Sequence, residues 1–251
     1  MTTDNRVSDA PAKEDAESEA VDVWAEKFGV PLPGPVRDDL LKFARLLLLW
    51  GQSINLTAAK SVAALVADHL PDAFAIAGRL AGPRAVAPEH PPERVVDVGS
   101  GGGLPGIPLA LIRSVSEVTL IEATGKKVAF LRTAIRELAL APRVGVEHRR
   151  VDLHGGYGRP SEGSDLQHVS HLGDSSHLAS QFDVAISRAM LPPAEWLPLG
   201  RLLVRPGGRV FCLGTEALTE WPPGLNLVHQ AAYPQEPRQS RRWLAELQRS
   251  T

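Results

Sequence analysis

A glycine-rich stretch directly after an apolar run constrains the fold of this chain more than any other feature. Residues 95–106 are Val-Val-Asp-Val-Gly-Ser-Gly-Gly-Gly-Leu-Pro-Gly, which predicts a buried strand, a tight turn and a helix that begins near Pro105. Glycines permit positive φ and let a ligand approach the main chain, and the first turn of a helix offers free N–H groups. A ligand-free turn needs only one or two glycines, so the stretch indicates a site for a nucleotide-like cofactor.

The composition is that of an ordinary globular protein. The chain has 251 residues, 43% of them hydrophobic, which suits one main domain, and no apolar run reaches the roughly 20 residues of a membrane span. The formal net charge of −2 excludes a generally cationic surface but allows a local basic face. The single cysteine, Cys212, excludes an internal disulfide and indicates a buried thiol in a cytoplasmic protein.

Strands and helices are predicted in alternation along the central part of the chain. The predicted strands cover residues 95–98, 117–121, 144–148, 182–186 and 209–213, with a further edge strand at 225–229, and the predicted helices between them cover 105–113, 125–140 and 194–204. Two more helices are predicted upstream, over 36–50 and 62–80, from apolar residues at helical spacing. This βα rhythm predicts an α/β fold, a doubly wound parallel sheet with helices on both faces and an N-terminal helical segment.

The same patterns divide the chain into segments. We predict a disordered tail over 1–20, an N-terminal helical segment and linker over 21–93, a main domain over 94–233 that contains a mobile loop over 153–180, and a C-terminal tail over 234–251. The first tail is acidic and polar, and the loop lacks periodic apolar residues. The second tail lacks a clear apolar strand.

An acidic residue completes the predicted cofactor site. Ligands of open parallel sheets bind beyond the carboxyl ends of the strands, where Gly99, Gly101 and Gly103 lie. Glu122 follows the next strand, about 20 residues after the glycines, where a carboxylate can accept hydrogen bonds from both hydroxyls of a ribose.

Two registers of the glycine motif predict different cofactors. Residues 101–106 fit the G-x-G-x-x-G pattern of NAD and FAD sites, so a NAD-dependent oxidoreductase is one hypothesis. In the register Asp97 to Gly103, the first glycine follows the strand directly, and this register resembles the first motif of the S-adenosylmethionine-dependent methyltransferases. We favour the second register, because a G-x-G-x-x-G match carries little information in a run so rich in glycine. The oxidoreductase hypothesis also lacks a proton-donating pair, since neither Tyr157 nor Tyr233 has a nearby lysine.

The residues around the turn are particular enough to indicate a family. Residues 97–110, 122–132, 186–189 and 55–58 resemble the RsmG (GidB) family of bacterial ribosomal RNA methyltransferases, and the similarity spans about residues 36–230. The resemblance implies a Rossmann-like methyltransferase domain over 94–233. It also implies transfer of a methyl group from S-adenosyl-L-methionine to N7 of a guanine in the 530 loop of 16S ribosomal RNA.

The resemblance also implies residue roles. The implied cofactor-binding residues are Gly99, Gly101, Gly103, Leu104, Glu122, Val151, Asp152 and Arg188, and the implied catalytic residues are Arg188 and Asn55. Val151 and Asp152 would flank the adenine, and Asn55 lies on a segment that would close over the site. Asp152 stands where the family has glutamate. With the divergent C-terminus, this departure keeps a second hypothesis open, a non-catalytic RNA-binding or ribosome-binding module.

The chemistry needs few special groups. Guanine N7 has a lone pair and no proton, so the reaction needs no general base, and positioning can supply up to ~10 kcal/mol. Lys126, Lys127 and Arg132 are the predicted RNA contacts, facing an unpaired loop of 16S ribosomal RNA or the 30S subunit. We expect no bound metal, because His168, His171 and His177 lack cysteine or carboxylate partners at site-forming spacing. We also expect the protein to be a monomer.

Overall fold

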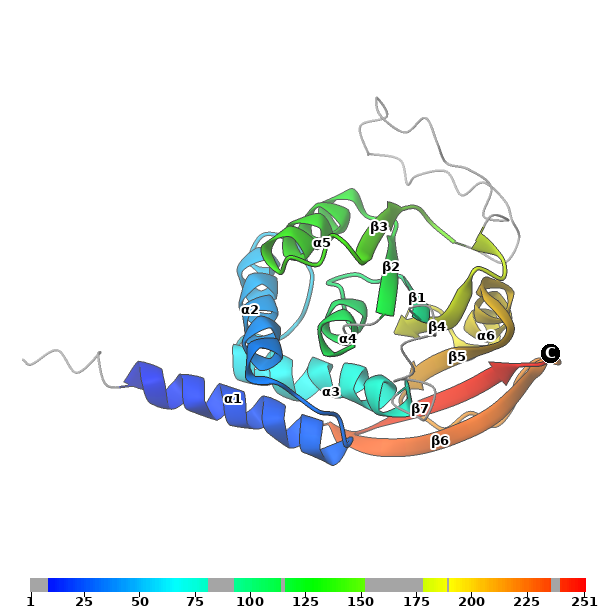
Figure 1. Ribbon diagram of the computed structural model, residues 1–251, viewed down its shortest axis with the longest axis horizontal. Helices are drawn as coiled ribbons and strands as arrows, with labels where there is room; N and C mark the ends of the chain where they lie inside the picture. Colours follow the sequence, from blue (N-terminus) through cyan, green and yellow to red (C-terminus); the bar gives the residue numbers. More distant parts are fainter. Residues whose placement is uncertain (1–8, 81–92, 114–115, 152–177, 189, 236–239) are drawn as a thin grey trace, which may run out of the picture.

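The computed structural model describes residues 9–80, 93–113, 116–151, 178–188, 190–235 and 240–251. It is an α/β protein in which helices pack on both faces of one twisted sheet (Figure 1). The helices are α1 (Asp9–Lys27), α2 (Gly34–Gly51), α3 (Val62–Leu80), α4 (Gly106–Ile112), α5 (Gly125–Glu137) and α6 (Pro193–Leu203). The strands are β1 (Glu93–Val98), β2 (Ser116–Glu122), β3 (Val144–His148), β4 (Phe182–Arg188), β5 (Val204–Gly214), β6 (Leu225–Gln235) and β7 (Ser240–Arg249).

The sheet has the strand order β3-β2-β1-β4-β5-β7-β6. Strands β1 to β5 pair in parallel, whereas β7 lies antiparallel between β5 and β6. The chain order reverses at β1, because β2 and β3 extend to one side of it and β4 and β5 to the other. This switch point is where open parallel sheets bind ligands, beyond the carboxyl ends of the strands.

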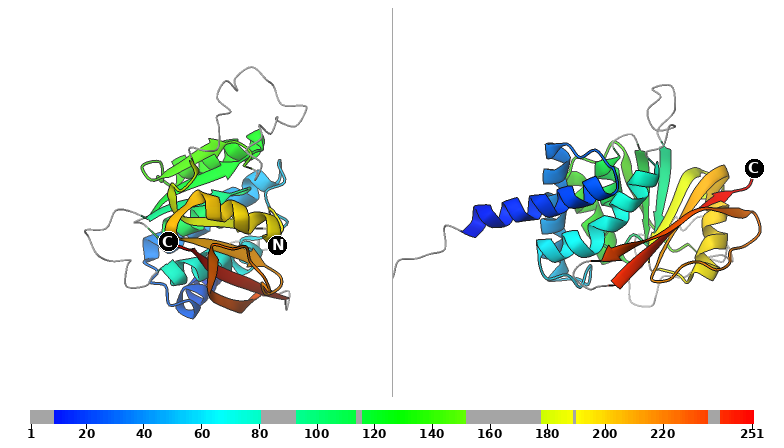
Figure 2. Two further views of the ribbon diagram at one scale, coloured as in Figure 1. Left: turned by 90° about the vertical axis from the view of Figure 1, so that its right-hand side faces the viewer. Right: turned by 90° about the horizontal axis from the view of Figure 1, so that it is seen from below.

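Alternating side chains of the central strands supply two separate cores, as the period of two in a strand requires. Val95 packs on the face covered by α1 to α5, and its neighbour Val96 packs on the face covered by α6. Cys212 lies on the α6 face and is buried, which confirms the predicted buried thiol. The predicted doubly wound sheet and N-terminal helical segment are therefore confirmed, and Figure 2 shows α1 to α3 packed together at one side of the sheet.

The prediction of a disordered tail over residues 1–20 was wrong for 9–20, which belong to helix α1. The helix looks solvated from its sequence, but Glu17 is buried and ion-paired with Arg45 of α2 at 3.2 Å. Val21 and Trp24 on the same helix are buried in the larger core. A helix with few apolar residues forms here because its partners come from elsewhere in the chain. Residues 1–8 lie outside the described residues.

The prediction of a C-terminal tail over 234–251 was also wrong, because residues 240–249 form β7 in the interior of the sheet. The predicted edge strand near 225–229 is confirmed and longer, as β6. The predicted mobile loop over 153–180 falls outside the described residues except for its last three. Of these, Leu178 is buried in the smaller core. The division of the chain into domains stays a prediction.

Candidate cofactor and active site

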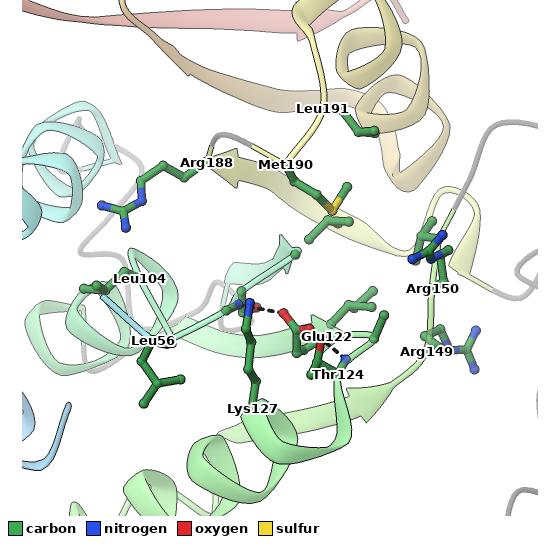
Figure 3. Close-up of a pocket in the computed structure, with 18 residues that line it drawn as sticks. Leu56, Leu104, Glu122, Thr124, Lys127, Arg149, Arg150, Arg188, Met190 and Leu191 are labelled. Atoms are coloured by element: carbon green, nitrogen blue, oxygen red, sulfur yellow. Dashed lines mark hydrogen bonds between the residues drawn. The ribbon is translucent and has the colours of Figure 1, made fainter. Parts of the chain in front are cut away.

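A cavity of about 640 Å³ opens at the carboxyl ends of β1, β2 and β4 (Figure 3). Its volume lies in the range of small-molecule sites, and it sits at the switch point of the sheet. The lining residues come from the glycine turn, the ends of β2 and β4, the start of α5, the segment after β3 and the segment before α3. One cavity thus collects residues from five separate stretches of the chain.

The glycine turn forms the floor of this cavity. Gly99, Gly101 and Gly103 have φ values of +74°, +56° and +76°, which side chains other than glycine rarely tolerate. The backbone N–H groups of Gly99 and Ser100 donate to the carbonyl oxygen of Ile121 on β2, at 2.9 and 3.0 Å. The turn is therefore held in its shape by the neighbouring strand before any ligand binds.

Glu122 lies at the end of β2 and joins this turn to the next helix. Its carboxylate accepts one hydrogen bond from the N–H of Gly101 at 2.9 Å and another from the N–H of Thr124 at 2.7 Å. The residue is buried yet lines the cavity. A carboxylate oxygen can accept more than one hydrogen bond, so both oxygens retain acceptor capacity for the hydroxyls of a ligand.

Asp97 is a second buried carboxyl group, beneath the turn. Its Oδ2 accepts a hydrogen bond from the N–H of Gly106 at 3.0 Å, and its Oδ1 is buried without a partner among the described residues. Burial raises the pKa of Asp97 to about 7, although the bond from Gly106 and the charge of Arg188 oppose the shift. Asp97 does not line the cavity, so its contact with Gly106 supports the start of α4 rather than a ligand.

Both apolar and basic side chains line the cavity. Val98, Ile121 and Val151 are buried and supply apolar surface, as the flat faces of an adenine require. Lys127 and Arg150 line the cavity together with Arg149, whose Nε is paired with Glu147 at 2.9 Å. The apolar part therefore suits a base, and the basic part suits an anionic group.

Arg188, the last residue of β4, lines the cavity, and its side chain extends toward α3 (Figure 3). Its Nη1 donates to Asp72 Oδ2 at 3.1 Å and to His69 Nδ1 at 2.8 Å. Both partners lie on α3. Its Nε and Nη2 groups make no hydrogen bond to the described residues, which leaves three N–H donors for a ligand.

The segment between α2 and α3 covers one side of the glycine turn. Leu56 lines the cavity, and a Cβ placed on Gly102 would lie 3.3 Å from the carbonyl oxygen of Leu56 and 2.8 Å from Leu47 Cδ1. Only glycine at this position allows such a close approach. Asn55 is exposed and is not among the cavity-lining residues, although it precedes Leu56 directly.

The structure brings together most of the predicted cofactor-binding residues. Those that line the cavity are Gly99, Gly101, Leu104, Glu122, Val151 and Arg188. Gly103 lies behind the turn, where a Cβ would meet Ile107 Cδ1 at 2.6 Å, and Asp152 lies outside the described residues. Of the three predicted RNA contacts, Lys127 lines the cavity, while Lys126 and Arg132 are exposed on α5.

Sequence reasoning missed three contributors to the site. Met190, two residues beyond β4, extends over the cavity, and Thr124 lines it at the start of α5. The rule that ligands bind beyond the carboxyl ends of strands was the signal for both. Asp72 was also missed, although a carboxylate three residues after His69 in a strongly apolar helix signals a shared buried face.

The three histidines considered as metal ligands lie outside the described residues. Among the described residues, no group of three or more histidine, cysteine or acidic side chains could hold a metal ion. Within the same part of the chain, no helix is both long and apolar enough to cross a membrane.

Comparison with known proteins identifies the family of this chain. The family profile described as rRNA small subunit methyltransferase G, GidB, matches residues 37–223. The chain belongs to this family. The match runs from the first turn of α2 to the segment after β5 and so includes every residue that lines the cavity.

Curated relatives carry the same family description. The chain is 33% identical to ribosomal RNA small subunit methyltransferase G of Anaeromyxobacter dehalogenans, over 78% of this chain and 77% of the relative. It is 36% identical to the protein of that name from Ralstonia nicotianae, over 77% and 76%. It is 30% identical to that of Chromohalobacter salexigens, over 84% and 86%.

Family membership carries the activity and decides between the two registers of the glycine motif. The GidB-family chain is an S-adenosylmethionine-dependent methyltransferase of 16S ribosomal RNA, and the implied methylation of guanine N7 in the 530 loop is confirmed by the family assignment. The hypotheses of a NAD-dependent oxidoreductase and of a non-catalytic module are therefore wrong. The roles of individual residues stay proposals.

Proposed function

We propose that the cavity at the carboxyl ends of β1, β2 and β4 binds S-adenosylmethionine and that Arg188 faces the guanine whose N7 receives the methyl group. The observation that carries this proposal is the position of Glu122. Its buried carboxylate is fixed by Gly101 on the turn and by Thr124 directly before α5, lines the cavity and retains acceptor capacity for a ligand. A ribose is the ligand part that such a carboxylate recognises.

The residues present fit this cofactor. Glu122 would hold the ribose hydroxyls, Val151 and Ile121 would enclose the adenine, and the backbone of Gly99 and Gly101 would lie against the methionine part. The bound cofactor supplies an electrophilic methyl group on a positively charged sulfur. The chain needs only to orient it, because the reactive centre is present in the cofactor itself.

The side chains at the cavity support a reaction without proton transfer. Among the described residues that line it there is no histidine and no cysteine, and Glu122 is the one carboxylate. That carboxylate is already occupied by two backbone donors. Guanine N7 attacks through a lone pair and loses no proton, so a site with positioning groups and no free base suits the reaction.

The basic residues around the cavity favour RNA as the second substrate. Lys127 of α5 and Arg150 after β3 line the cavity, and Lys126 and Arg132 are exposed on the same helix as Lys127. Cationic side chains contact phosphates without reading sequence. We propose that these four residues, defined here as the α5 rim, hold the RNA backbone next to the 530 loop.

Methyl transfer from labelled S-adenosylmethionine tests the proposal. Naked 16S ribosomal RNA and 30S subunits, both lacking this methyl group, are each incubated with the protein, and the modified nucleotide is mapped. Incorporation at N7 of one guanine in the 530 loop by the wild type, and a strongly reduced but measurable rate in Arg188→Ala, is the expected result. An Arg188→Ala protein with the normal rate contradicts the role of Arg188.

We further propose that one chain acts alone in the cytoplasm. One copy of the chain brings the glycine turn, Glu122 and Arg188 to the same cavity, and these are the residues proposed to bind the cofactor and to face the guanine. Sedimentation equilibrium at micromolar concentration is expected to give the monomer mass. A dimer that persists on dilution contradicts this.

A further inference from the structure

A buried network of charged and polar side chains lies directly behind Arg188. Asp72 of α3 is fully buried and accepts hydrogen bonds from three side chains. Its Oδ2 accepts from Arg188 Nη1 at 3.1 Å and Arg242 Nη1 at 3.2 Å, and its Oδ1 accepts from the hydroxyl of Tyr233 at 2.6 Å. Arg242 and Tyr233 lie on β7 and β6.

Tyr233 and Arg242 are fixed donors in this network. Burial, followed by the charge of Asp72, raises the pKa of Tyr233 far above its ordinary range, so the hydroxyl keeps its proton and donates. Arg242 is always charged and donates only. The C-terminal hairpin β6–β7 therefore secures the carboxylate that in turn holds Arg188.

His69 joins Arg188 to the segment that covers the cavity. Its Nδ1 lies 2.8 Å from Arg188 Nη1, and its Nε2 lies 3.0 Å from Thr57 Oγ1. A guanidinium can only donate, so Nδ1 must carry a lone pair, and the proton of the neutral ring must be on Nε2. Thr57 Oγ1 also accepts from the N–H of Ala59 at 3.1 Å, which fixes the hydroxyl that His69 contacts.

Both hydrogens of Arg188 Nη1 are used in this way, one by Asp72 and one by His69. The two contacts together define the plane of the guanidinium, because a planar group held at one nitrogen by two acceptors can no longer rotate. Its remaining N–H groups are then presented to the cavity from a fixed position. Arg188 and Arg242 both pair with the single carboxylate of Asp72, so this network has a net positive charge.

We propose that Asp72 and His69 are positioning residues for methyl transfer. Asp72 locks Arg188 to the C-terminal hairpin, and His69 couples Arg188 to the segment at Thr57 that closes over the glycine turn. This inference rests on the proposed role of Arg188. It assigns a function to the C-terminal hairpin, which supplies no residue to the wall of the cavity yet orients one that does.

Kinetics of methyl transfer by variants of the full chain test the Asp72 part. Tyr233→Phe removes one hydroxyl and keeps the ring, and Asp72→Asn removes the charge. We expect kcat to fall by up to ~100-fold in Asp72→Asn, the size that a misplacement of about 1 Å produces. The decrease in kcat should be smaller in Tyr233→Phe. This variant replaces Asp72→Asn in the test if Asp72→Asn does not fold.

Glu246→Gln is the matched control. Glu246 is likewise a buried carboxylate that joins α3 to the C-terminal hairpin, through Arg79 at 2.7 Å, and it does not contact Arg188. Each variant is also combined with Arg188→Ala. If Asp72 acts through Arg188, Asp72→Asn or Tyr233→Phe adds no further loss of kcat in that background, whereas a purely structural role gives multiplied losses. Multiplied losses would overturn the proposal.

The tautomer of His69 gives a readout that is independent of activity. In ¹⁵N NMR spectra of histidine-labelled protein, the signals that disappear in His69→Gln should be those of a neutral ring protonated at Nε2. An imidazolium, or a ring protonated at Nδ1, at neutral pH would contradict the link to Arg188. The effects of Thr57→Val and Arg188→Ala on kcat should be non-additive when the two are combined. In a His69→Ala background they should become additive.

The outcomes separate this inference from the proposed function. If Arg188→Ala methylates normally, the proposed role of Arg188 fails, while the tautomer of His69 can still be as expected. If Arg188→Ala is strongly impaired but the Asp72 and His69 variants are as active as Glu246→Gln, only the positioning network fails.

Discussion

The carboxylate of Glu122 at the end of β2 accepts a hydrogen bond of 2.9 Å from the backbone N–H of Gly101 in the glycine turn. The contact makes one side chain both a support of the turn and a candidate ligand for the ribose. A change at Glu122 is therefore expected to affect folding and cofactor binding together, whereas a change at a purely ligand-binding residue affects only the second.

Glu122→Gln is expected to weaken binding of S-adenosylhomocysteine by roughly 10- to 100-fold. The amide replaces one acceptor oxygen by a donor, which faces the N–H of Gly101 or of Thr124 and loses a charged hydrogen bond of about 1.5–3 kcal/mol. Isothermal titration calorimetry measures the affinity. Glu117→Gln, an exposed position on the same strand, is the control, and equal affinities in the two variants would contradict the assignment.

Gly103→Ala is expected to destabilise the protein by about 1–3 kcal/mol. Its φ of +76° disfavours any side chain, and the added Cβ would lie 2.6 Å from Ile107 Cδ1, which forces the packing apart. Urea unfolding followed by circular dichroism gives the free energy of unfolding. Gly145→Ala on β3, where an added Cβ would have no atom within 4 Å, should change the free energy of unfolding little. A similar loss in this control would show that the backbone conformation and packing at Gly103 are not the cause.

The stability of the fold is expected to fall as the pH rises from about 4 to about 7, through Asp97. Its pKa is 3.8 in the unfolded chain and about 7 in the folded protein because of burial. Between these values the folded state keeps a proton that the unfolded state has released, so unfolding becomes easier with rising pH and the effect levels off above 7.

Comparison with Asp97→Asn isolates this contribution. The difference in the free energy of unfolding between wild type and variant should shift by a few kcal/mol between pH 5 and pH 8, in favour of the variant at the higher pH. Urea titrations at four pH values provide the measurement. A difference that is constant over the range shows that Asp97 titrates normally.

Lys126→Ala and Arg132→Ala are expected to weaken RNA binding without changing the affinity for S-adenosylhomocysteine. Both side chains are exposed on α5, and each lost phosphate contact should reduce the salt dependence of the RNA association constant by about one unit of slope. Filter binding to 16S ribosomal RNA at several salt concentrations measures it.

Arg205→Ala supplies the matched loss of one positive charge. Arg205 lies at the amino end of β5, opposite the cavity, and pairs with Asp183. The Arg205→Ala variant should retain the wild-type salt dependence of the RNA association constant. If all three variants have the same slope as the wild type, the α5 rim does not contact the RNA backbone.

The sequence by itself determined the parts of the protein whose signals are local. The run of apolar residues into the glycines, the helical spacing over 36–50 and the acidic residue after the second strand each lie within one stretch of chain. Periodicity reports which face of an element is buried, so β1 to β5, α2 to α6 and the position of Glu122 followed from it. These elements also place Arg188 at the end of its strand.

Only the tertiary structure decided where the charged ends of the chain belong. Helix α1 and strand β7 are rich in ionisable residues, which by sequence indicate solvent. Glu246 is nonetheless buried, because it pairs with Arg79, 167 positions away, and Asp72 meets Arg242, 170 positions away. A buried charge is tolerated only when a partner is brought to it, and no local pattern shows which distant residue that partner is.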